Sequence, residues 1–492
     1  MNTKLLKQKI LDLAIRGKLT QQLKSDGTAA DLLTQISDER RKTRDERKGT
    51  RSKKSGVILS EAQSAKSKDL GQIIPLDKSE APFEIPTNWE WVRLGDLCNA
   101  SSGKTPSTSQ KEFWNGNVLW VTSKDVKQKY IDSTQICLSD LGASSMQLYP
   151  PKTMIIVGRS GILRHSLPVA ILKKSATVNQ DLKALVFKDD RIVEFVYAVI
   201  KGMEQHLLHE YKKAGTTVDN LNFDLFLTAP IPLPPLAEQQ RIVEKIQEAF
   251  AEIDSIENNK ELLKSHIKQA RQKILDLAIH GRLVPQNKTD EPASVLLERI
   301  TRDNPHYEKI EDGPFEIPEN WAWAKLLDVC RAPITDGTHN SPPNTNEGEF
   351  FYITAKNIKD DGVDLSNVSY VSKEIHNSIV SRCCPEKGDV LLTKDGTIGN
   401  ATVNNLNQPF SLLSSVALIK THIKVLPWYI VFCLRSSYLQ KSMKNDAKGT
   451  ALKRVILSQI NDFVIPLPPF NEQSRIVAKI EELFFLLNKI KT

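Results

Sequence analysis

The sequence predicts a mixed α/β (α+β) protein: two globular domains joined by long antiparallel coiled-coil helices, with pseudo-two-fold circular symmetry. Two observations lead to this prediction. One is a long stretch with the apolar spacing of a coiled-coil helix. The other is an internal repeat whose halves are circularly permuted along the chain.

Residues 234–280 form the long stretch, which contains neither proline nor glycine after Pro235. Its apolar residues recur at alternating steps of four and three, which places one narrow seam on a helix. A helix of about 45 residues would be roughly 67 Å long, and its seam would need a partner. The seam residues are Ile242, Ile246, Ala249, Ile253, Ile256, Leu263, Ile267, Ala270, Ile274 and Leu277.

The internal repeat supplies that partner. Residues 231–246 recur at 465–480 with 12 of 16 positions identical, and residues 271–286 match 7–22 with 11 of 16 identical. The C-terminus therefore carries only the first half of the long helix, and the N-terminus carries only the second half. We expect both fragments to pack beside the central helix and together to imitate a second copy of it.

Two further segments repeat and open the globular domains. PFEIPTNWEWVRLGDLC at 82–98 returns at 314–330 with 11 of 17 positions identical, and we interpret its prolines and tryptophans as a structural clasp. Short apolar runs predict strands, and longer ones predict helices. The expected strands are 118–121, 154–157, 182–187, 350–354, 390–393 and 416–419, and the expected helices are 193–203 and 426–434.

The predicted organisation follows from these repeats. The interiors of the two domains diverge far more than their borders, which indicates a constant frame carrying two different recognition units. The predicted segments are an N-terminal half helix (1–22), a polar and basic linker (23–81), a first domain (82–230), the long helix (231–283), a second linker (284–313), a second domain (314–464) and a C-terminal half helix (465–492).

Composition sets broad limits. The net charge of +8 permits a polyanionic partner without requiring one, and no apolar run reaches the length of a membrane span. The six cysteines form no CxxC pair, which favours structural cysteines in a reducing cytoplasm. Residues 40–54 hold nine Lys or Arg in fifteen positions, and this segment is either a solvated tether or a loose phosphate-contacting arm.

Several motifs resemble those of one family. They are SGKTPS at 102–107, PLPPLAEQQRIVEKI at 232–246, DGTHNSPP at 336–343, GDVLLTKDGTIG at 388–399 and PLPPFNEQSRIVAKI at 466–480. Together with the permuted order of segments, they resemble the specificity subunits of type I restriction–modification systems, over almost the whole chain.

The resemblance implies a function. Each domain would be a target-recognition domain that reads one half of a bipartite site in double-stranded DNA. The helices would set the spacer and dock two modification (methyltransferase) subunits, and two restriction (endonuclease/translocase) subunits would join them. The complex would methylate adenine and cleave DNA with S-adenosylmethionine, ATP and Mg²⁺. This chain itself would hold no cofactor or metal, catalyse nothing and bind no membrane.

Three segments of the sequence resemble catalytic motifs only in part. LPPL at 233–236 and LPPF at 467–470 lack the polar first residue of an amino-methyltransferase box, and GKT at 103–105 lacks the first glycine of a phosphate-binding loop. Nine histidines include no HExxH pair. Two alternatives stay open at this point: a coiled-coil scaffold without sequence preference, and a self-contained DNA methyltransferase.

Candidate DNA contacts are polar and basic residues that suit phosphates and base edges. In the first domain they are Ser102, Lys104, Thr105, Ser107, Ser123, Lys124, Arg159, Ser160, Arg164, Lys212, Lys213 and Thr216. In the second they are Thr335, Asp336, Thr338, His339, Lys356, Asn357, Lys394, Asp395, Thr397, Lys448, Thr450, Lys453 and Arg454.

The starts of the two repeated helices are candidates for docking the modification subunits. We expect them to be exposed at the domain–helix junctions, although a helix cap with a buried clasp explains the same residues equally well. The candidates are Pro234, Pro235, Glu238, Gln239, Pro468, Pro469, Glu472 and Gln473.

Overall fold

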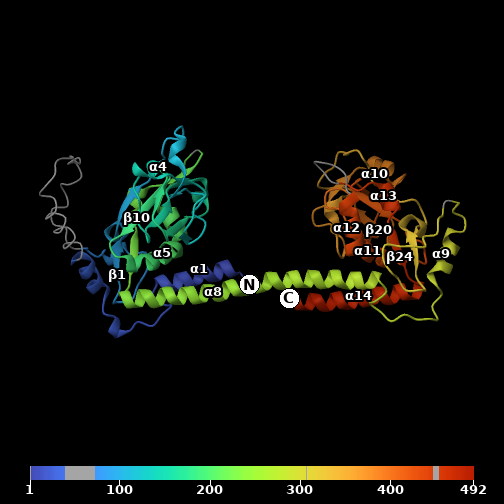
Figure 1. The fold of residues 1–492 in the computed structure, drawn as a ribbon, viewed down its shortest axis with the longest axis horizontal. Helices are drawn as coiled ribbons and strands as arrows, with labels where there is room; N and C mark the ends of the chain where they lie inside the picture. Colours follow the sequence, from blue (N-terminus) through green and yellow to red (C-terminus); the bar gives the residue numbers. More distant parts are fainter. Residues whose placement is uncertain (1, 39–72, 216, 306, 447–453, 492) are drawn as a thin grey trace. The chain divides into compact units, whose positions relative to one another are not determined.

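The computed structural model describes residues 2–38, 73–215, 217–305, 307–446 and 454–491. They form two compact units, 1–258 and 259–492, which we call the first and second unit. The boundary falls within α8 (Leu236–Ile279), a single helix of 44 residues (Figure 1). The predicted long helix is therefore confirmed, and each unit contains about half of it.

The first unit begins and ends with helix and has a β-rich interior. Its helices are α1 (Thr3–Ile15), a helix over 29–38, α3 (Leu94–Leu97), α4 (Asp140–Ser144), α5 (Val193–Gly202), α6 (Glu204–Tyr211), α7 (Phe223–Phe226) and α8. Its strands are β1 (Glu90–Arg93), β2 (Cys98–Ser102), β3 (Trp114–Val121), β4 (Tyr130–Ile131), β5 (Cys137–Leu138), β6 (Met154–Val157), β7 (Arg159–Ser160), β8 (Val169–Leu172), β9 (Ala176–Val178), β10 (Leu182–Phe187), β11 (Lys212–Lys213), β12 (Asp219–Leu221) and β13 (Pro230–Leu233).

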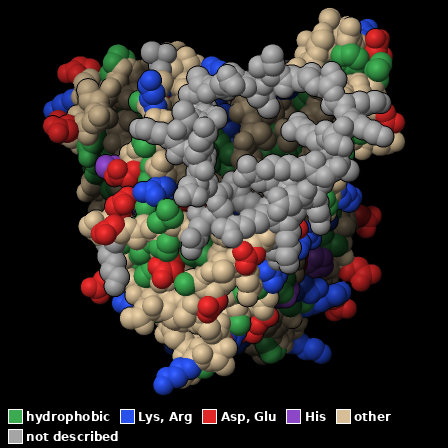
Figure 2. All heavy atoms as spheres, turned by 90° about the vertical axis from the view of Figure 1, so that its left-hand side faces the viewer, with side chains coloured by type: hydrophobic (Ala, Val, Ile, Leu, Met, Phe, Trp, Pro, Cys, Tyr) green, Lys and Arg blue, Asp and Glu red, His purple; other side chains and the backbone are tan. Residues whose placement is uncertain are grey.

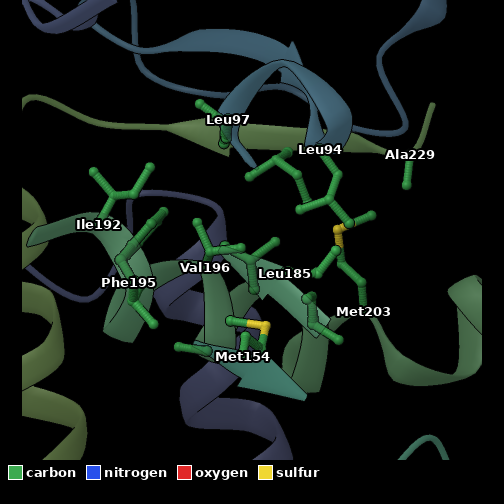
Figure 3. Close-up of a cluster of buried hydrophobic side chains, with 14 of the residues drawn as sticks. Leu94, Leu97, Met154, Leu185, Ile192, Phe195, Val196, Met203 and Ala229 are labelled. Carbon is green, nitrogen blue, oxygen red and sulfur yellow. The ribbon is translucent and has the colours of Figure 1, made fainter. Parts of the chain in front are cut away.

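A five-stranded sheet in the order β2-β10-β6-β8-β4 is the centre of this unit, and smaller sheets β5-β3-β9 and β11-β12-β7 flank it. Met154 and Leu185 from the central sheet pack against Phe195 and Val196 of α5 (Figure 3). The sheet is buried on this face because α5 covers it. The other face packs in a second buried cluster with Val121 and Tyr149. Because both faces are buried, β6 and β8 are apolar throughout without alternation.

The second unit repeats this plan. Its helices are α9 (Ala293–Thr301), α10 (Lys373–Val380), α11 (Pro427–Arg435), α12 (Ser437–Asp446), α13 (Leu457–Asn461) and α14 (Phe470–Lys491). Its strands are β14 (Ala322–Lys325), β15 (Thr335–Asp336), β16 (Phe350–Ile353), β17 (Ile358–Lys359), β18 (Gly362–Val363), β19 (Ser369–Val371), β20 (Val390–Thr393), β21 (Ala401–Val403), β22 (Phe410–Leu412), β23 (Val416–Ile419) and β24 (Val464–Leu467).

Its main sheet runs β15-β23-β20-β21, beside the sheet β19-β16-β22 and the pair β17-β18. The predicted strands over 154–157, 182–187, 390–393 and 416–419 coincide with β6, β10, β20 and β23, and those over 118–121 and 350–354 overlap β3 and β16. The predicted helices correspond to α5 and α11. The mixed α/β prediction is confirmed.

Each terminal fragment packs antiparallel to one half of α8. In the first unit Thr3 and Lys7 of α1 reach Glu257 and Asp254 of α8. In the second unit Arg271 of α8 donates to Asn488 of α14 at 2.6 Å. The ends of the chain therefore cover α8 as the repeat predicted.

The predicted seam is only partly correct. Ile242, Ile246, Ile253 and Ile267 are buried, but Ile256 and Leu263 are 49% and 39% exposed. In the last turns of α8 the buried residues are Leu275, Ala278 and Ile279. Leu275 and Ala278 each lie one position after an expected seam residue, Ile274 or Leu277. A straight helix drifts from a 3.5-residue repeat, and these turns pack against the domain core as well as against α14.

A short antiparallel strand pair joins each domain to its long helix. Glu90 pairs with Leu233 and Arg93 with Pro230 in β1-β13, while Ala322 pairs with Leu467 and Lys325 with Val464 in β14-β24. The pairing register is the same in both units. Each strand β13 and β24 therefore delivers the chain directly into the first turn of a helix, α8 or α14.

Candidate nucleic-acid interface

A buried polar cluster, which we call the clasp, holds the start of α8 in the first unit. Trp89 donates through Nε1 to Glu238 at 3.0 Å, and Gln22 donates to the same carboxylate at 2.9 Å and to the Gly17 carbonyl at 2.7 Å. Gly17 has φ +66, and a Cβ there would lie 2.4 Å from Pro86 Cγ. A bulkier residue does not fit, so the helix end, the proline and the tryptophan meet only at a glycine.

The second unit builds the same clasp at the start of α14. Trp321 donates to Glu472 at 3.0 Å, and Gln286 donates to Glu472 at 2.5 Å and to the Gly281 carbonyl at 3.1 Å. Gly281 has φ +67 and lies against Pro318. Burial raises the pKa of Glu472, although the donors Trp321 and Gln286 oppose the rise.

An ion pair completes each clasp. Arg241 binds Asp26 through both terminal nitrogens at 2.9 and 2.7 Å, and Arg475 binds Asp290 at 2.7 Å. Hydrogen bonding from these arginines holds the pKa of Asp26 and of Asp290 below its usual range. Both carboxylates lie in the connection that follows the half-helix repeat, so the pairs fix that connection to α8 and α14.

The expected exposure of the helix starts is therefore wrong. All eight docking candidates are buried within the chain: Pro234, Pro235, Glu238, Gln239, Pro468, Pro469, Glu472 and Gln473. Gln239 and Gln473 donate to the carbonyls of Pro234 and Pro468, which closes the first turn. The physical reason is that two tryptophans, Trp89 and Trp321, lie far from these carboxylates in the sequence but cover them in the fold. The alternative of a buried helix cap is therefore confirmed.

The small sheet β11-β12-β7 of the first unit brings together several candidate DNA contacts. Arg159 pairs with Asn220, and Lys213 pairs with Asn220 from the other side. Arg159 and Lys213 are exposed. These side chains, which lie more than 50 positions apart in sequence, therefore share one surface.

Asp219 orders the charges beside this sheet. Its carboxylate lies 3.2 Å from Lys212 and 3.8 Å from Arg164. The backbone N–H of Gly215, assisted by Lys212 and Arg164, holds the pKa of Asp219 below its usual range. Asp219 therefore remains ionised and orients the two cations, a role that sequence reasoning missed.

The loop after β2 meets the same region through the turn 179–181. Lys104 N donates to the Val178 carbonyl at 3.0 Å, the Thr105 hydroxyl donates to Gln180, and Arg159 N donates to the Asp181 carbonyl at 3.2 Å. A Cβ on Gly103 would lie 1.9 Å from the Val178 oxygen, so this approach requires glycine. Ser107 lies farther along this loop, where it bonds Ser109 at 2.8 Å.

A hollow lies between the end of β2 and the sheet β11-β12-β7. Its lining includes Ser102, Lys183, Lys213 and Asn220. Lys183 donates to Ser102 at 2.6 Å and lies over the Phe223 ring. Lys183 and Asn220 were absent from the sequence candidates, because they lie inside strands where only the pairing register shows which face they occupy.

The second unit repeats this geometry with other residues. Thr338 N donates to the Leu412 carbonyl at 2.9 Å, as Lys104 does to Val178, and Gly337 makes the matching close approach. Asp395 forms an isolated backbone β-bridge with Arg454, at the position that corresponds to the pairing of Arg159 with Asn220 in the first unit. The candidate loops therefore recur at matching backbone positions.

Three candidates of the second unit are buried, contrary to expectation. Asp336 lies 3.3 Å from Lys394 and 3.3 Å from Arg382, and the Lys394 side chain is only 7% exposed. Asn357 caps its own turn by accepting from Thr354 at 3.0 Å. Their polar atoms are occupied inside the domain, so these residues shape the surface without forming it.

The remaining candidates lie at the surface or outside the described residues. His339, Lys356, Thr397 and Arg454 are exposed, as is Lys124, and Ser123, Ser160, Thr335, Thr338 and Asp395 are partly exposed. Thr216, Lys448, Thr450 and Lys453, as well as the basic segment 40–54, lie outside the described residues. Figure 2 shows one face of the first unit, and basic and acidic side chains are interspersed over its coloured part.

Among the described residues, none of the helices combines the length and apolar character that a membrane crossing requires.

A family model described as "Type I restriction modification DNA specificity domain" matches residues 86–265 and 318–492. The chain belongs to this family. The match confirms the resemblance drawn from the sequence motifs, and with it the role in DNA sequence specificity.

Similar proteins agree with this assignment. The type I restriction enzyme EcoAI specificity subunit of Escherichia coli is 24% identical over 565 residues, which cover 99% of this chain and 90% of that protein. The EcoR124I/EcoR124II specificity subunit of Escherichia coli is 36% identical over 158 residues, covering 32% and 39%. These matches do not favour a scaffold or a self-contained methyltransferase.

The fold is also similar to a solved structure described as "Structural basis underlying complex assembly and conformational transition of the type I R-M system". The TM-score is 0.54 at 18% identity, with 83% of this chain and 93% of that chain covered. At this identity the likeness concerns the fold.

Proposed function

We propose that this chain is the non-catalytic subunit that selects the DNA target of a type I restriction–modification complex. Each unit reads one half of a bipartite site in double-stranded DNA, and α8 sets the unread spacer. Two modification and two restriction subunits carry out adenine methylation and cleavage, using S-adenosylmethionine, ATP and Mg²⁺ that this chain does not itself bind.

One observation carries the proposal: the two units present different side chains from the same backbone positions. Arg159 beside Asn220 in the first unit corresponds to Asp395 beside Arg454 in the second. A guanidinium and an amide favour guanine and adenine edges, whereas a carboxylate accepts from cytosine. Two surfaces of one design and unlike chemistry suit two unlike half-sites.

Two cysteines that end the repeated segments 82–98 and 314–330 have the environment of structural groups. Burial raises the pKa of Cys98 and of Cys330 to about 12, so neither thiol is a nucleophile near neutral pH. Each thiol donates to the carbonyl four residues before it, Leu94 or Leu326, as a structural group would.

The first experiment is methylation mapping of a host genome with and without this chain, co-expressed with its modification subunit. We expect a new methylated motif of two short halves separated by a fixed unread spacer. A soluble complex that adds no motif would contradict the proposal.

Alanine variants then locate the surface. Lys104→Ala should weaken binding to all sequences and lower the salt slope by about one unit, whereas Arg159→Ala should relax one position of one half-site. If the assembled enzyme bound DNA equally well with both changes, this surface would not be the DNA face.

The spacer role of α8 has its own test. Inserting one helical turn within 254–262 should lengthen the unread spacer that mapping reports, starting from a half-site separation of about 34 Å. A motif with an unchanged spacer would show that α8 is not the ruler.

A further inference from the structure

A cleft of the second unit lies where α8 meets α11, α12 and α14, and we call it the basic cleft. Five of its lining residues are cations, and Asp360 is the one carboxylate among the described lining residues. The amides of Gln272, Gln440 and Asn400 also line it. The cations are Lys264, Lys268, Arg271, Arg435 and Lys444.

Within the described residues, few carboxylates lie close enough to neutralise these cations. Lys264 has Glu261 at 2.6 Å, and Asp360 lies 3.6 Å from Arg435. No ion pair of Lys268 or Lys444 occurs within the described ranges. The cleft therefore holds an excess of positive charge.

Arg271 gives a second, independent observation at the cleft. Its Nε is buried and has no hydrogen-bond acceptor in the described part of the chain, while its NH2 group bonds the neutral Asn488. Buried N–H donors are almost always paired, because an unpaired one loses its hydration without compensation. Burial lowers the pKa of Arg435. The nearby carboxylate of Asp360 raises this pKa, and the positive charge of Arg271 lowers it further.

At the matching place, the described residues of the first unit form a groove without a comparable excess of cations. Gln8 donates to the Gly202 carbonyl as Gln272 does to the Arg435 carbonyl, so a glycine occupies the position of Arg435. Lys7, the counterpart of Arg271 in the helix repeat, pairs with Asp254.

The matching groove of the first unit is correspondingly more apolar and mixed in charge. It is lined in part by Leu11, Tyr197, Phe250, Lys201 and Glu194. In the tail repeat, Asp254 of this groove corresponds to Asn488 in the second unit. The excess positive charge thus arises from changes at positions of an otherwise shared frame.

The basic cleft shares a loop with the candidate DNA surface. Gly399 and Asn400 line the cleft, and Gln440 donates to the Gly399 carbonyl at 2.8 Å. The same loop carries Asp395 and Thr397 a few residues earlier. A polyanion that is bound at the recognition surface and extends along this loop would reach the cleft.

We propose that the basic cleft binds a phosphate of the DNA backbone beside the half-site read by the second unit. This inference rests on the proposed function. Arginine forks, lysines and amides are the usual donors to phosphate oxygens, and such contacts carry no sequence information. The second unit therefore has a sequence-independent anchor that the first unit lacks.

The test uses the chain assembled with its modification subunits and a DNA duplex carrying the mapped motif. The variant is Lys268→Gln with Lys444→Gln, since both lysines are exposed and have no described ion pair. The matched control is Lys273→Gln with Lys441→Gln, which removes the same charge from the exposed faces of α8 and α12 outside the cleft. Affinity is measured over a series of salt concentrations, for motif and unrelated DNA.

We expect the cleft variant to lower the slope of log K against log salt by about 0.9 per lost phosphate contact, and the control to leave it unchanged. The ratio of affinities for motif and unrelated DNA should stay constant. Ethylation of one backbone phosphate beside the second half-site should block the wild type but not the cleft variant.

Equal slopes for the cleft variant and the control would overturn the inference. Loss of assembly with the modification subunits in the cleft variant alone would also overturn it, by assigning the cleft to a protein partner. If the wild-type complex showed no preference for any motif, the proposed function itself would fail, and a normal preference with equal slopes would reject only the cleft.

Discussion

The two units share a frame but differ in what the frame presents. The tryptophan–glutamate hydrogen bond of the clasp is 3.0 Å in both units, and β1-β13 has the same register as β14-β24. At one matching backbone position, however, the first unit carries Arg159 and the second carries Asp395. Buried geometry is thus separated from surface chemistry, so the loops can change without loss of the fold.

The largest effect should come from the glycine of each clasp. Gly17→Ala and Gly281→Ala combine a positive φ with a Cβ less than 2.5 Å from Pro86 or Pro318, so each should destabilise its own unit by roughly 2–6 kcal/mol. Hydrogen exchange should show the loss within 1–258 for the first variant and within 259–492 for the second.

Gly161→Ala is the control for both variants, because an added Cβ there meets nothing within 4 Å. Equal loss of protection in this control would refute the close-packing argument.

The next effect concerns the clasp donors. Trp89→Phe and Trp321→Phe each remove one donor from a buried carboxylate, which should cost about 1–3 kcal/mol. Because the geometry is the same, the two costs should agree closely in denaturant unfolding monitored separately for each unit. Widely different costs would show that the two clasps are not energetically equivalent.

The recognition loops should give effects on binding and not on stability. Arg159→Ala should cost about 1–3 kcal/mol at one position of the first half-site, and Asp395→Ala should relax one position of the second. Competition between duplexes with single base changes measures both. A variant that relaxed positions in both halves would contradict the assignment of one unit to each half-site.

The smallest effect should come from the ion pairs of Glu386 with Lys420 and Arg331 in the second unit. Hydrogen bonds from Lys420 and Arg331 lower the pKa of Glu386 to about 2. A lowered pKa stabilises the fold above the ordinary value of 4.5, and this stability is lost as the pH falls toward 2. Glu386→Gln should therefore lower the Tm at pH 6 but not near pH 2, where the wild-type carboxyl is protonated too. The decrease should be small, because Glu386 itself is exposed and solvent screens its charge.

Glu347→Gln is the comparison for this pH series, since Glu347 is exposed and no ion pair of it occurs among the described residues. A Tm difference between wild type and Glu386→Gln that grew on acidification would reverse the predicted sign.

Much of the frame could be predicted because its signals are local or repeated. The apolar runs of β6, β10, β20 and β23 mark buried strands by themselves. The duplicated helix halves predicted which ends of the chain cover α8. Where the sequence interpretation failed, the decisive neighbour lay far away: Glu238 is buried by Trp89, 149 positions before it.

The sequence by itself determined the long helix, the two mixed α/β domains and the repeated order of segments, since periodicity and repetition are properties of the chain alone. Only the tertiary structure decided which polar residues are buried and which face outward. Lys394 and Arg454 have similar charge, but one is enclosed beside Asp336 and the other is exposed. The difference depends on strand pairing across more than 50 residues, which local sequence does not encode.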